Sequence, residues 1–291
     1  MKLNGFLNIL KPPGMTSHDV VNFVRKHLHI KKVGHLGTLD PGAAGVLPIC
    51  IGKATKLSNY MLEHKKSYRA EITFGFSTDT LDKYGNILHV TKVRNLNENE
   101  LINVINSFRG DIKQIPPMYS AKKVKGKKLY EYAKEGKIIE RNEIDITIYD
   151  IKIVSYVNLY RLMLDIECSK GTYIRTLVYD ICKKLSMAGY MSLLIRTAVG
   201  PFKIEDSITI EEIKNKNFKL IDIDSVLDMP LIFLNDVDSY KIKHGQIIMN
   251  KYNINNLPNV KLYDNNKNLI GIGRVNDNKI SIERLLVGVE E

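Results

Sequence analysis

Apolar and polar residues alternate in several stretches of the chain, and these stretches predict β-strands. The clearest is 68–76, where Tyr68 and every second residue after it are apolar, with Arg69 and Glu71 among the polar residues between them. One face of this strand is therefore expected to be buried. The other predicted strands are 5–10, 46–51, 144–157, 159–168 and 193–199, with 144–157 and 159–168 paired as a hairpin.

Apolar residues at helical spacing, together with start and stop signals, predict three main helices in the same part of the chain. Thr16 and Asp19 have the spacing of a capping box, which begins the first helix. The second covers 98–109, with Ile102 among its inward residues. Thr172 is expected to cap the third helix, whose apolar side includes Ile174, Leu177, Val178, Ile181 and Leu185.

The pattern changes near Asp228-Met229-Pro230. Beyond this point a short helix is expected to end at His244 and Gly245. Asn- and Asp-rich turns then separate three predicted strands, at 260–263, 269–275 and 279–285. The C-terminal part is therefore expected to be a small, β-rich unit.

The chain is strongly basic, which points to a polyanionic partner. It has 291 residues, 43 Lys and Arg against 32 Asp and Glu, and a formal net charge of +11. Residues 235–291 carry only +1, so about +10 lies in the first 234 residues. Nucleic acid is the leading expectation for the partner, and a merely solvated basic surface is the alternative.

Other composition features indicate a cytoplasmic globular protein. No apolar run is long enough to span a membrane, and no signal peptide begins at Met1. The three cysteines, Cys50, Cys168 and Cys182, are far apart and are expected to be buried, reduced thiols. The seven scattered histidines show no metal-ligand spacing.

The stretch 34–48 is the strongest candidate for a functional loop. It contains four glycines and two prolines, so it cannot be a regular helix or a central strand. Its one carboxylate, Asp40, precedes Pro41, and His35 lies five residues earlier. A plain surface turn is the alternative, but the position between two apolar runs favours a catalytic loop on a rigid scaffold.

A run of lysines provides a candidate surface for nucleic acid. It follows the rigid, proline-containing segment 114–121 and is interleaved with Gly126 and followed by Tyr130 and Tyr132. Lysines beside aromatic rings suit an RNA backbone and its bases, whereas a solvated charged face is the alternative. The lysines are Lys122, Lys123, Lys125, Lys127 and Lys128.

Five motifs, taken together and in this order, resemble the bacterial tRNA pseudouridine-55 synthases of the TruB type. They are 11–17, 34–48, 66–69, 117–121 with the lysine run, and 169–176. The resemblance covers essentially the whole chain. It implies an α+β pseudouridine synthase fold, with a central mixed, mainly antiparallel sheet flanked by helices and a small C-terminal PUA-like module. The implied domains are 1–232, with an RNA-binding insert at about 113–140, and 233–291.

The resemblance also implies a reaction in which a uridine is flipped out of the tRNA T-loop and isomerised to pseudouridine. Asp40 matches the indispensable aspartate, which acts either by covalent attack or by removing a ribose proton. Arg175 is expected to pair with Asp40 and orient it.

Further site residues are implied by the same resemblance. His35 would occupy the space vacated by flipped bases, and Tyr68 would stack on the flipped uracil and is a candidate for its deprotonation. Tyr173 and Leu194 would line the pocket. The chain departs from the family pattern in the unusually small segment 42–45.

The implied reaction needs no cofactor and no metal. The implied partner is the T-stem and loop of tRNA, bound by a monomer with no obligatory protein partner and no membrane. A tRNA-folding chaperone or non-catalytic RNA-binding protein would share the basic surface but would have no use for an Asp40–Arg175 pair. A guide-RNA-dependent archaeal or eukaryotic relative is a further alternative, which the near-neutral C-terminal part disfavours.

Overall fold

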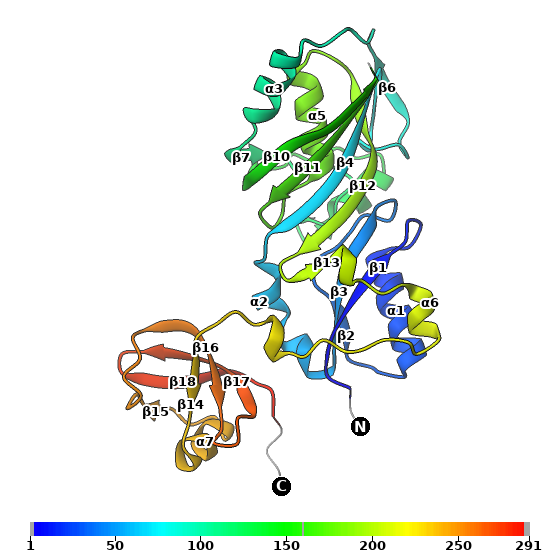
Figure 1. The fold of residues 1–291 in the computed structure, drawn as a ribbon. Coiled ribbons are helices and arrows are strands. Elements are labelled where there is room, and N and C mark those ends of the chain that lie inside the picture. Colours follow the sequence, from blue (N-terminus) through cyan, green and yellow to red (C-terminus); the bar gives the residue numbers. More distant parts are fainter. Residues whose placement is uncertain (1–2, 159, 288–291) are drawn as a thin grey trace.

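One long sheet runs through the first part of the chain (Figure 1). The structure is a computed structural model that describes residues 3–158 and 160–287. Within these residues the sheet has nine strands, in the order β1-β3-β12-β4-β11-β10-β7, with β2 beside β3 and β13 beside β12. The pairing is antiparallel except between β12 and β3. The strands are β1 Gly5–Lys11, β2 Val33–His35, β3 Ala44–Ile51, β4 Lys66–Phe74, β7 Gly110–Gln114, β10 Ile144–Asn158, β11 Arg161–Cys168, β12 Gly189–Val199 and β13 Phe202–Lys203.

Helices cover the two halves of this sheet separately. Apolar residues of α1 and α6 form one core with β1 and β3, whereas α3 and α5 form another with β4, β10 and β11. Thr16 and Asp19 form the expected capping box at the start of α1. The helical elements of this part are α1 Ser17–Leu28, η1 Gly52–Leu57, α2 Ser58–Leu62, α3 Glu98–Asn106, α5 Ile174–Lys184, η2 Ile204–Asp206, α6 Ile210–Lys214 and η3 Asp224–Val226.

The structure corrects two local predictions. Ile102 is 38% exposed, because α3 turns Leu101 and Ile105 toward the sheet and leaves Ile102 at the edge of that face. Thr172 does not cap α5. Its hydroxyl donates instead to the Ser169 carbonyl oxygen, and α5 begins at Ile174. Strand bounds are corrected as well: β4 ends at Phe74, so the predicted strand 68–76 breaks at Gly75, and residues 44–48, expected not to form a central strand, lie in β3 between β1 and β12. The other predicted strands and the buried, unpaired cysteines are confirmed, although the first residue of the predicted strand 159–168 lies outside the described residues.

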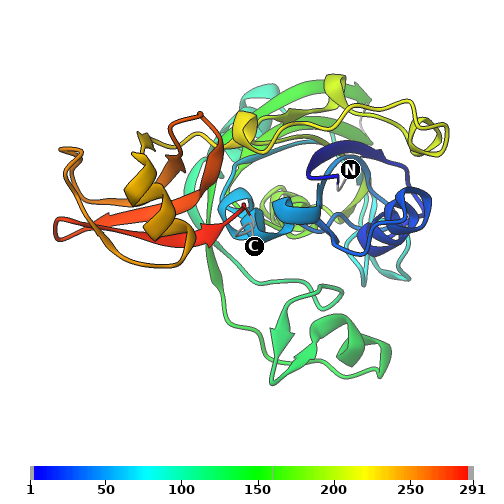
Figure 2. The same ribbon diagram turned by 90° about the horizontal axis from the view of Figure 1, so that it is seen from below.

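Two hairpins project from the main sheet. One consists of β5 (Phe76–Thr78) and β6 (Ile87–Val90), which follow β4 directly. The other lies between β7 and β10 and contains β8 (Lys123–Val124), β9 (Lys127–Lys128) and α4 (Leu129–Lys134). Figure 2 shows the second as a separate lobe, joined to the sheet by two extended segments.

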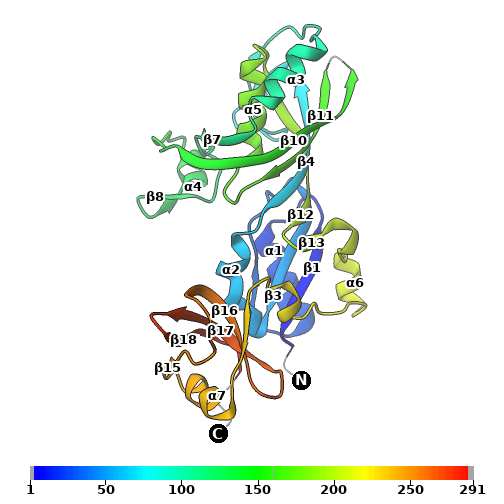
Figure 3. The same ribbon diagram turned by 60° about the vertical axis from the view of Figure 1, so that its left-hand side comes forward.

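A second sheet begins at Leu231 and packs beside η1 and α2 (Figures 1 and 3). In the described residues its strand order is β14-β16-β17-β18-β15. Ile272 and Leu286 join the apolar cluster that contains Leu57 and Met61, and the Lys56 ammonium donates to the Leu285 carbonyl oxygen at 2.7 Å. The elements are β14 Leu231–Phe233, α7 Asp236–Lys243, β15 Ile248–Met249, β16 Leu257–Tyr263, β17 Leu269–Asn276 and β18 Lys279–Leu285. None of the helices in 3–158 or 160–287 has the length and apolarity that crossing a membrane requires.

Candidate active site

Asp40 lies in the loop between β2 and β3 and is held by an arginine from α5. The Arg175 Nε atom is 2.9 Å from Asp40 Oδ2, and Arg175 Nη2 donates to Asp40 Oδ1 at 3.2 Å. The pair expected from the sequence is therefore present, with the side-by-side geometry in which a guanidinium fixes a carboxylate. The arginine side chain is only 5% exposed, whereas the Asp40 side chain is 36% exposed. One face of the carboxylate is thus open to an incoming molecule.

Arg175 ties three segments together. Besides Asp40, it donates to the Tyr119 carbonyl oxygen at 2.8 Å and to the Thr80 carbonyl oxygen at 3.1 Å. A second carboxylate, Asp82, lies 3.8 Å from Nη1. A cation in the first turn of a helix opposes the helix dipole, and these acceptors offset that cost. The Asp40 loop, the β5–β6 loop and the start of the insert are therefore held at one point.

Lys11 supports the Asp40 loop from the side of β1. Its buried ammonium donates to the carbonyl oxygens of Pro12 at 2.8 Å, Met15 at 2.7 Å and Pro41 at 3.1 Å. Burial lowers the pKa of Lys11 to about 8, an effect that the nearby Asp40 charge opposes. The sequence does not reveal this role, because a lysine that bonds only backbone carbonyls leaves no side-chain partner to find in the sequence.

Arg196 supports the same loop from β12, and it too was missed. This buried guanidinium donates to the carbonyl oxygens of Val46 at 2.7 Å, Gly37 at 3.1 Å and Thr38 at 3.2 Å. Gly45 allows the backbone of β12 to lie this close to the loop, because a Cβ atom at residue 45 would be 2.2 Å from the Arg196 carbonyl oxygen. The parallel pairing of β12 with β3 thus brings an arginine from late in the chain against the Asp40 loop.

Tyr68 and Leu194 lie on adjacent strands beside the loop. Leu194 pairs with Ala70 in the β12–β4 ladder, and both Tyr68 and Leu194 belong to the apolar cluster that also contains Leu39. Burial raises the pKa of the Tyr68 hydroxyl, while the Arg196 charge opposes this rise. The phenol is therefore protonated at neutral pH.

His35 and Tyr173 come from different elements near the loop, β2 and the start of α5. His35 pairs with Ile49 at the end of β2, and its buried Nδ1 has no hydrogen-bond partner among the described residues. Burial lowers the pKa of this imidazole, and the Arg196 charge acts in the same direction, so the ring is neutral at pH 7. Tyr173 precedes α5, and its N–H donates to the Gln114 side-chain oxygen at 3.0 Å.

The lysine run forms the β8–β9 hairpin at the tip of the insert, where its members are in different surroundings. Lys123 and Lys125 are exposed, whereas Lys127 is paired with Glu135 and lies over the Tyr132 ring. Lys122 and Lys128 are half-buried. Lys123 and Lys125 are therefore the members of the run most accessible to a phosphate.

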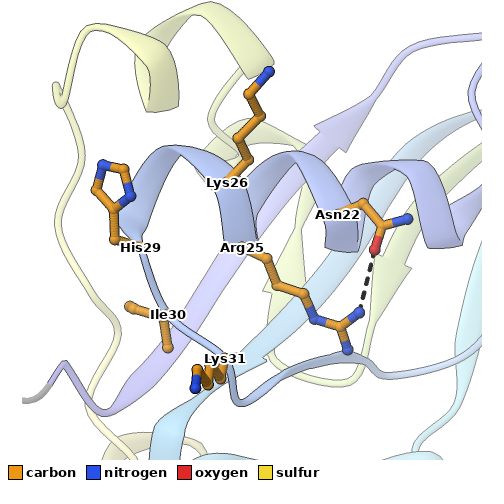
Figure 4. Close-up of a pocket in the computed structure, with 6 residues that line it drawn as sticks. All are labelled: Asn22, Arg25, Lys26, His29, Ile30 and Lys31. Atoms are coloured by element: carbon orange, nitrogen blue, oxygen red, sulfur yellow. Dashed lines mark hydrogen bonds between the residues drawn. The ribbon is translucent and has the colours of Figure 1, made fainter.

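A shallow basic depression lies at the C-terminal end of α1 (Figure 4). The Arg25 guanidinium donates to the Asn22 side-chain oxygen at 3.2 Å along one wall. Its lining contains no residue of the Asp40 loop, and it is therefore separate from the site described above. The lining residues are Asn22, Arg25, Lys26, His29, Ile30 and Lys31. Across the described part of the chain, no group of three or more His, Cys, Asp or Glu side chains is placed to hold a metal ion.

Solved structures share this fold. A Cbf5-Nop10-Gar1 complex matches with a TM-score of 0.74 and 24% identity over 98% of this chain and 85% of the other. An H/ACA RNP bound to a substrate RNA containing 2'-deoxyuridine matches with a TM-score of 0.72 and 22% identity, over 97% and 85%. At these identities the likeness establishes the fold alone: a mixed sheet with helices and a β-rich C-terminal part.

Sequence relatives are much closer. A tRNA pseudouridine synthase B of Caldanaerobacter subterraneus subsp. tengcongensis is 55% identical over 285 residues, which covers 98% of this chain and 100% of the relative. A protein of the same name from Alkaliphilus oremlandii is 50% identical over 260 residues, 88% and 86% of the two chains.

Family models account for most of the chain. The N-terminal domain of the TruB family pseudouridylate synthases matches residues 25–174. The tRNA pseudouridylate synthase B C-terminal domain matches 175–230, and the C-terminal domain of pseudouridine synthase II TruB matches 230–286. With the fold, the held aspartate and these matches together, the chain belongs to the TruB family of pseudouridylate synthases.

Proposed function

We propose that this protein converts uridine 55 in the T-loop of tRNA to pseudouridine, with Asp40 as the catalytic residue. One observation carries the proposal: the Asp40 carboxylate is 36% exposed although its partner Arg175 is only 5% exposed. A carboxylate that served only to neutralise a buried arginine would have no need of an open face. An open, oriented carboxylate is what attack on a ribose carbon, or removal of a ribose proton, requires.

The reaction moves one bond of the nucleotide. The bond between N1 of the uracil and C1' of the ribose breaks, the base turns, and C5 bonds to C1'. C5 then loses its proton and N1 takes one up, so that the product is an isomer of the substrate. The base must first leave its stack, because a carboxylate cannot reach C1' inside a folded loop. The two roles open to Asp40, covalent attack and proton removal, are equally compatible with its position.

The residues around Asp40 take distinct parts in the proposal. Tyr68 stacks on the flipped uracil and, because its hydroxyl is protonated at neutral pH, it acts first through its ring rather than as a base. Leu194 and Tyr173 close the apolar side of the pocket. Neutral His35 fills the space that the flipped bases leave.

The rest of the chain holds the RNA. The insert with Lys122, Lys123, Lys125, Lys127 and Lys128 folds over the T-stem and loop, and the C-terminal part, proposed as a PUA-like module at 233–291, holds the rest of the tRNA. In this proposal the protein acts as a monomer with no obligatory protein partner. Since free tRNA is the substrate, the proposal includes a cytoplasmic location.

The test is release of tritium from C5-labelled uridine in a T-stem-loop RNA, with purified protein and no guide RNA. Asp40→Asn should abolish release while the RNA still binds. Full activity of Asp40→Asn would overturn the assignment of Asp40. A requirement for a guide or a protein partner would favour the guide-dependent alternative, and tRNA annealing that is indifferent to Asp40→Asn would identify the chaperone role.

A further inference from the structure

An exposed aromatic ring from a neighbouring loop lies against the Asp40 loop. Tyr84 belongs to the loop between β5 and β6, and its side chain is not part of any apolar core. A Cβ atom at Gly42, two residues after Asp40, would lie 2.1 Å from the Tyr84 ring. The ring therefore covers the backbone of the catalytic loop where a side chain would otherwise stand. Tyr84 is nevertheless 62% exposed, so its other face is open to solvent.

The contact with Tyr84 explains why residue 42 is a glycine. Gly42 does not have the left-handed backbone that reserves a position for glycine. An alanine would suit its backbone conformation, so the missing side chain is needed for the ring and not for the turn. Gly42 and Tyr84 therefore form a matched pair.

Tyr84 is also tied to the catalytic carboxylate through Arg175. The Tyr84 N–H donates to Asp82 Oδ1 at 3.0 Å, and Asp82 Oδ2 lies 3.8 Å from the guanidinium that holds Asp40. Thr80 donates to the same Asp82 oxygen at 2.6 Å and offers its carbonyl oxygen to Arg175. These bonds hold the backbone at Tyr84 close to the guanidinium that contacts Asp40.

The surroundings of the ring suit a nucleobase. The Lys83 ammonium lies 5.4 Å from the ring centre, where it could meet the phosphate of a base stacked on that ring. The next strand, β6, exposes Ile87, Leu88 and Val90, each at least 60% exposed. An apolar, cation-flanked rim beside a basic RNA site is the combination that binds unstacked bases.

We infer that Tyr84 is a nucleobase-stacking residue at the rim of the active site, and that it stacks on an unpaired base of the T-loop next to the flipped uridine. This inference rests on the proposed function. Tyr84 contributes to RNA affinity and to holding the loop open, and Asp40 carries the chemistry.

The test measures binding of a T-stem-loop RNA to Tyr84→Phe, Tyr84→Leu and Tyr84→Ala. Loss of one base–aromatic stack should weaken binding about tenfold in the Leu and Ala variants, whereas Phe should stay within about twofold of the parent. The decrease in RNA affinity should be the same at every salt concentration, since no phosphate contact is removed. Tyr149→Ala, which removes an exposed tyrosine of β10 beside Lys65, is the matched control and should leave binding unchanged.

Gly42→Ala tests the pair independently, because it displaces the ring without removing it. It should weaken binding in the parent but have no effect in the Tyr84→Ala background. The inference is overturned if Tyr84→Leu binds the RNA as well as the parent. It is also overturned if Tyr149→Ala weakens RNA binding as much as Tyr84→Ala does, or if Gly42→Ala weakens binding equally in both backgrounds. Tritium release by the parent is measured in the same preparation. A parent inactive on the T-stem-loop refutes the proposed function, whereas an active parent with normal binding by the Tyr84 variants refutes only this inference.

Discussion

The Lys11 ammonium donates to the carbonyl oxygen of Pro41, the residue directly after Asp40, at 3.1 Å. This contact joins the first strand of the chain to the catalytic loop through a cation that has no solvent exposure. A buried cation that binds three carbonyl oxygens is sensitive to pH in a way that an exposed lysine is not.

Stability should therefore change with pH through Lys11. Its pKa is lowered to about 8 in the folded protein from an ordinary value of 10.5, so between these values the unfolded chain binds more protons. The free energy of unfolding then rises with pH across this window. Urea unfolding of the parent and of Lys11→Met, at about pH 7.5 and about pH 9.5, measures the free energy of unfolding of each protein. The difference in this free energy between the two proteins should shift in favour of the parent at the higher pH. A difference that does not change with pH would contradict a buried Lys11 with a lowered pKa.

Arg175→Lys should damage turnover more than binding. An ammonium is a point donor without the planar fork that lets Arg175 contact both Asp40 oxygens while it also reaches two carbonyl oxygens, so the carboxylate loses its orientation. The single-turnover rate should fall about 100-fold, while affinity for the T-stem-loop stays within about threefold. The melting temperature of the variant is the control for folding. An effect confined to affinity would mean that Arg175 does not position Asp40.

Gly45→Ala should be strongly destabilising. The backbone at Gly45 has a φ of +115°, and an added Cβ would lie 2.2 Å from the Arg196 carbonyl oxygen, which is part of the sheet and cannot move away freely. We expect a loss of about 3 kcal/mol or more in the free energy of unfolding. Gly136→Ala is the matched control: its φ is +71° but nothing lies within 4 Å of the added atom. It should cost only about 1 kcal/mol, from the backbone conformation alone. Equal losses at the two positions would show that the close approach of β12 is not tight.

Lys123→Ala with Lys125→Ala should reduce the salt dependence of RNA binding. Both lysines are exposed, and each phosphate contact that is removed should lower the slope of log affinity against log salt by about 1. Lys127→Ala serves as the comparison, because its partner Glu135 already balances its charge within the insert. A slope unaffected by the double substitution would exclude these two lysines from phosphate contact.

The sequence predicted the elements well and the supports of the site poorly. Alternation and capping signals located β4, the β10–β11 hairpin and α1, because these depend on local pattern. The Asp40–Arg175 pair was expected only through the resemblance to a known family. Lys11 and Arg196 were missed, since both act on backbone carbonyls that a linear pattern does not reveal. The reason for a glycine at position 42 became clear only when Tyr84 was seen to occupy the space of its side chain.

The residues that hold the catalytic loop come from distant parts of the chain. Arg175 follows Asp40 by 135 residues, and Arg196 follows Gly37 by 159. During translation, Asp40 therefore leaves the ribosome long before the two arginines that fix its surroundings. A nascent chain that ends before residue 196 cannot form the geometry described above, even with every residue of the loop already made. The geometry of the site is thus completed late in synthesis, and a prematurely terminated chain would carry Asp40 without the arginines that orient it.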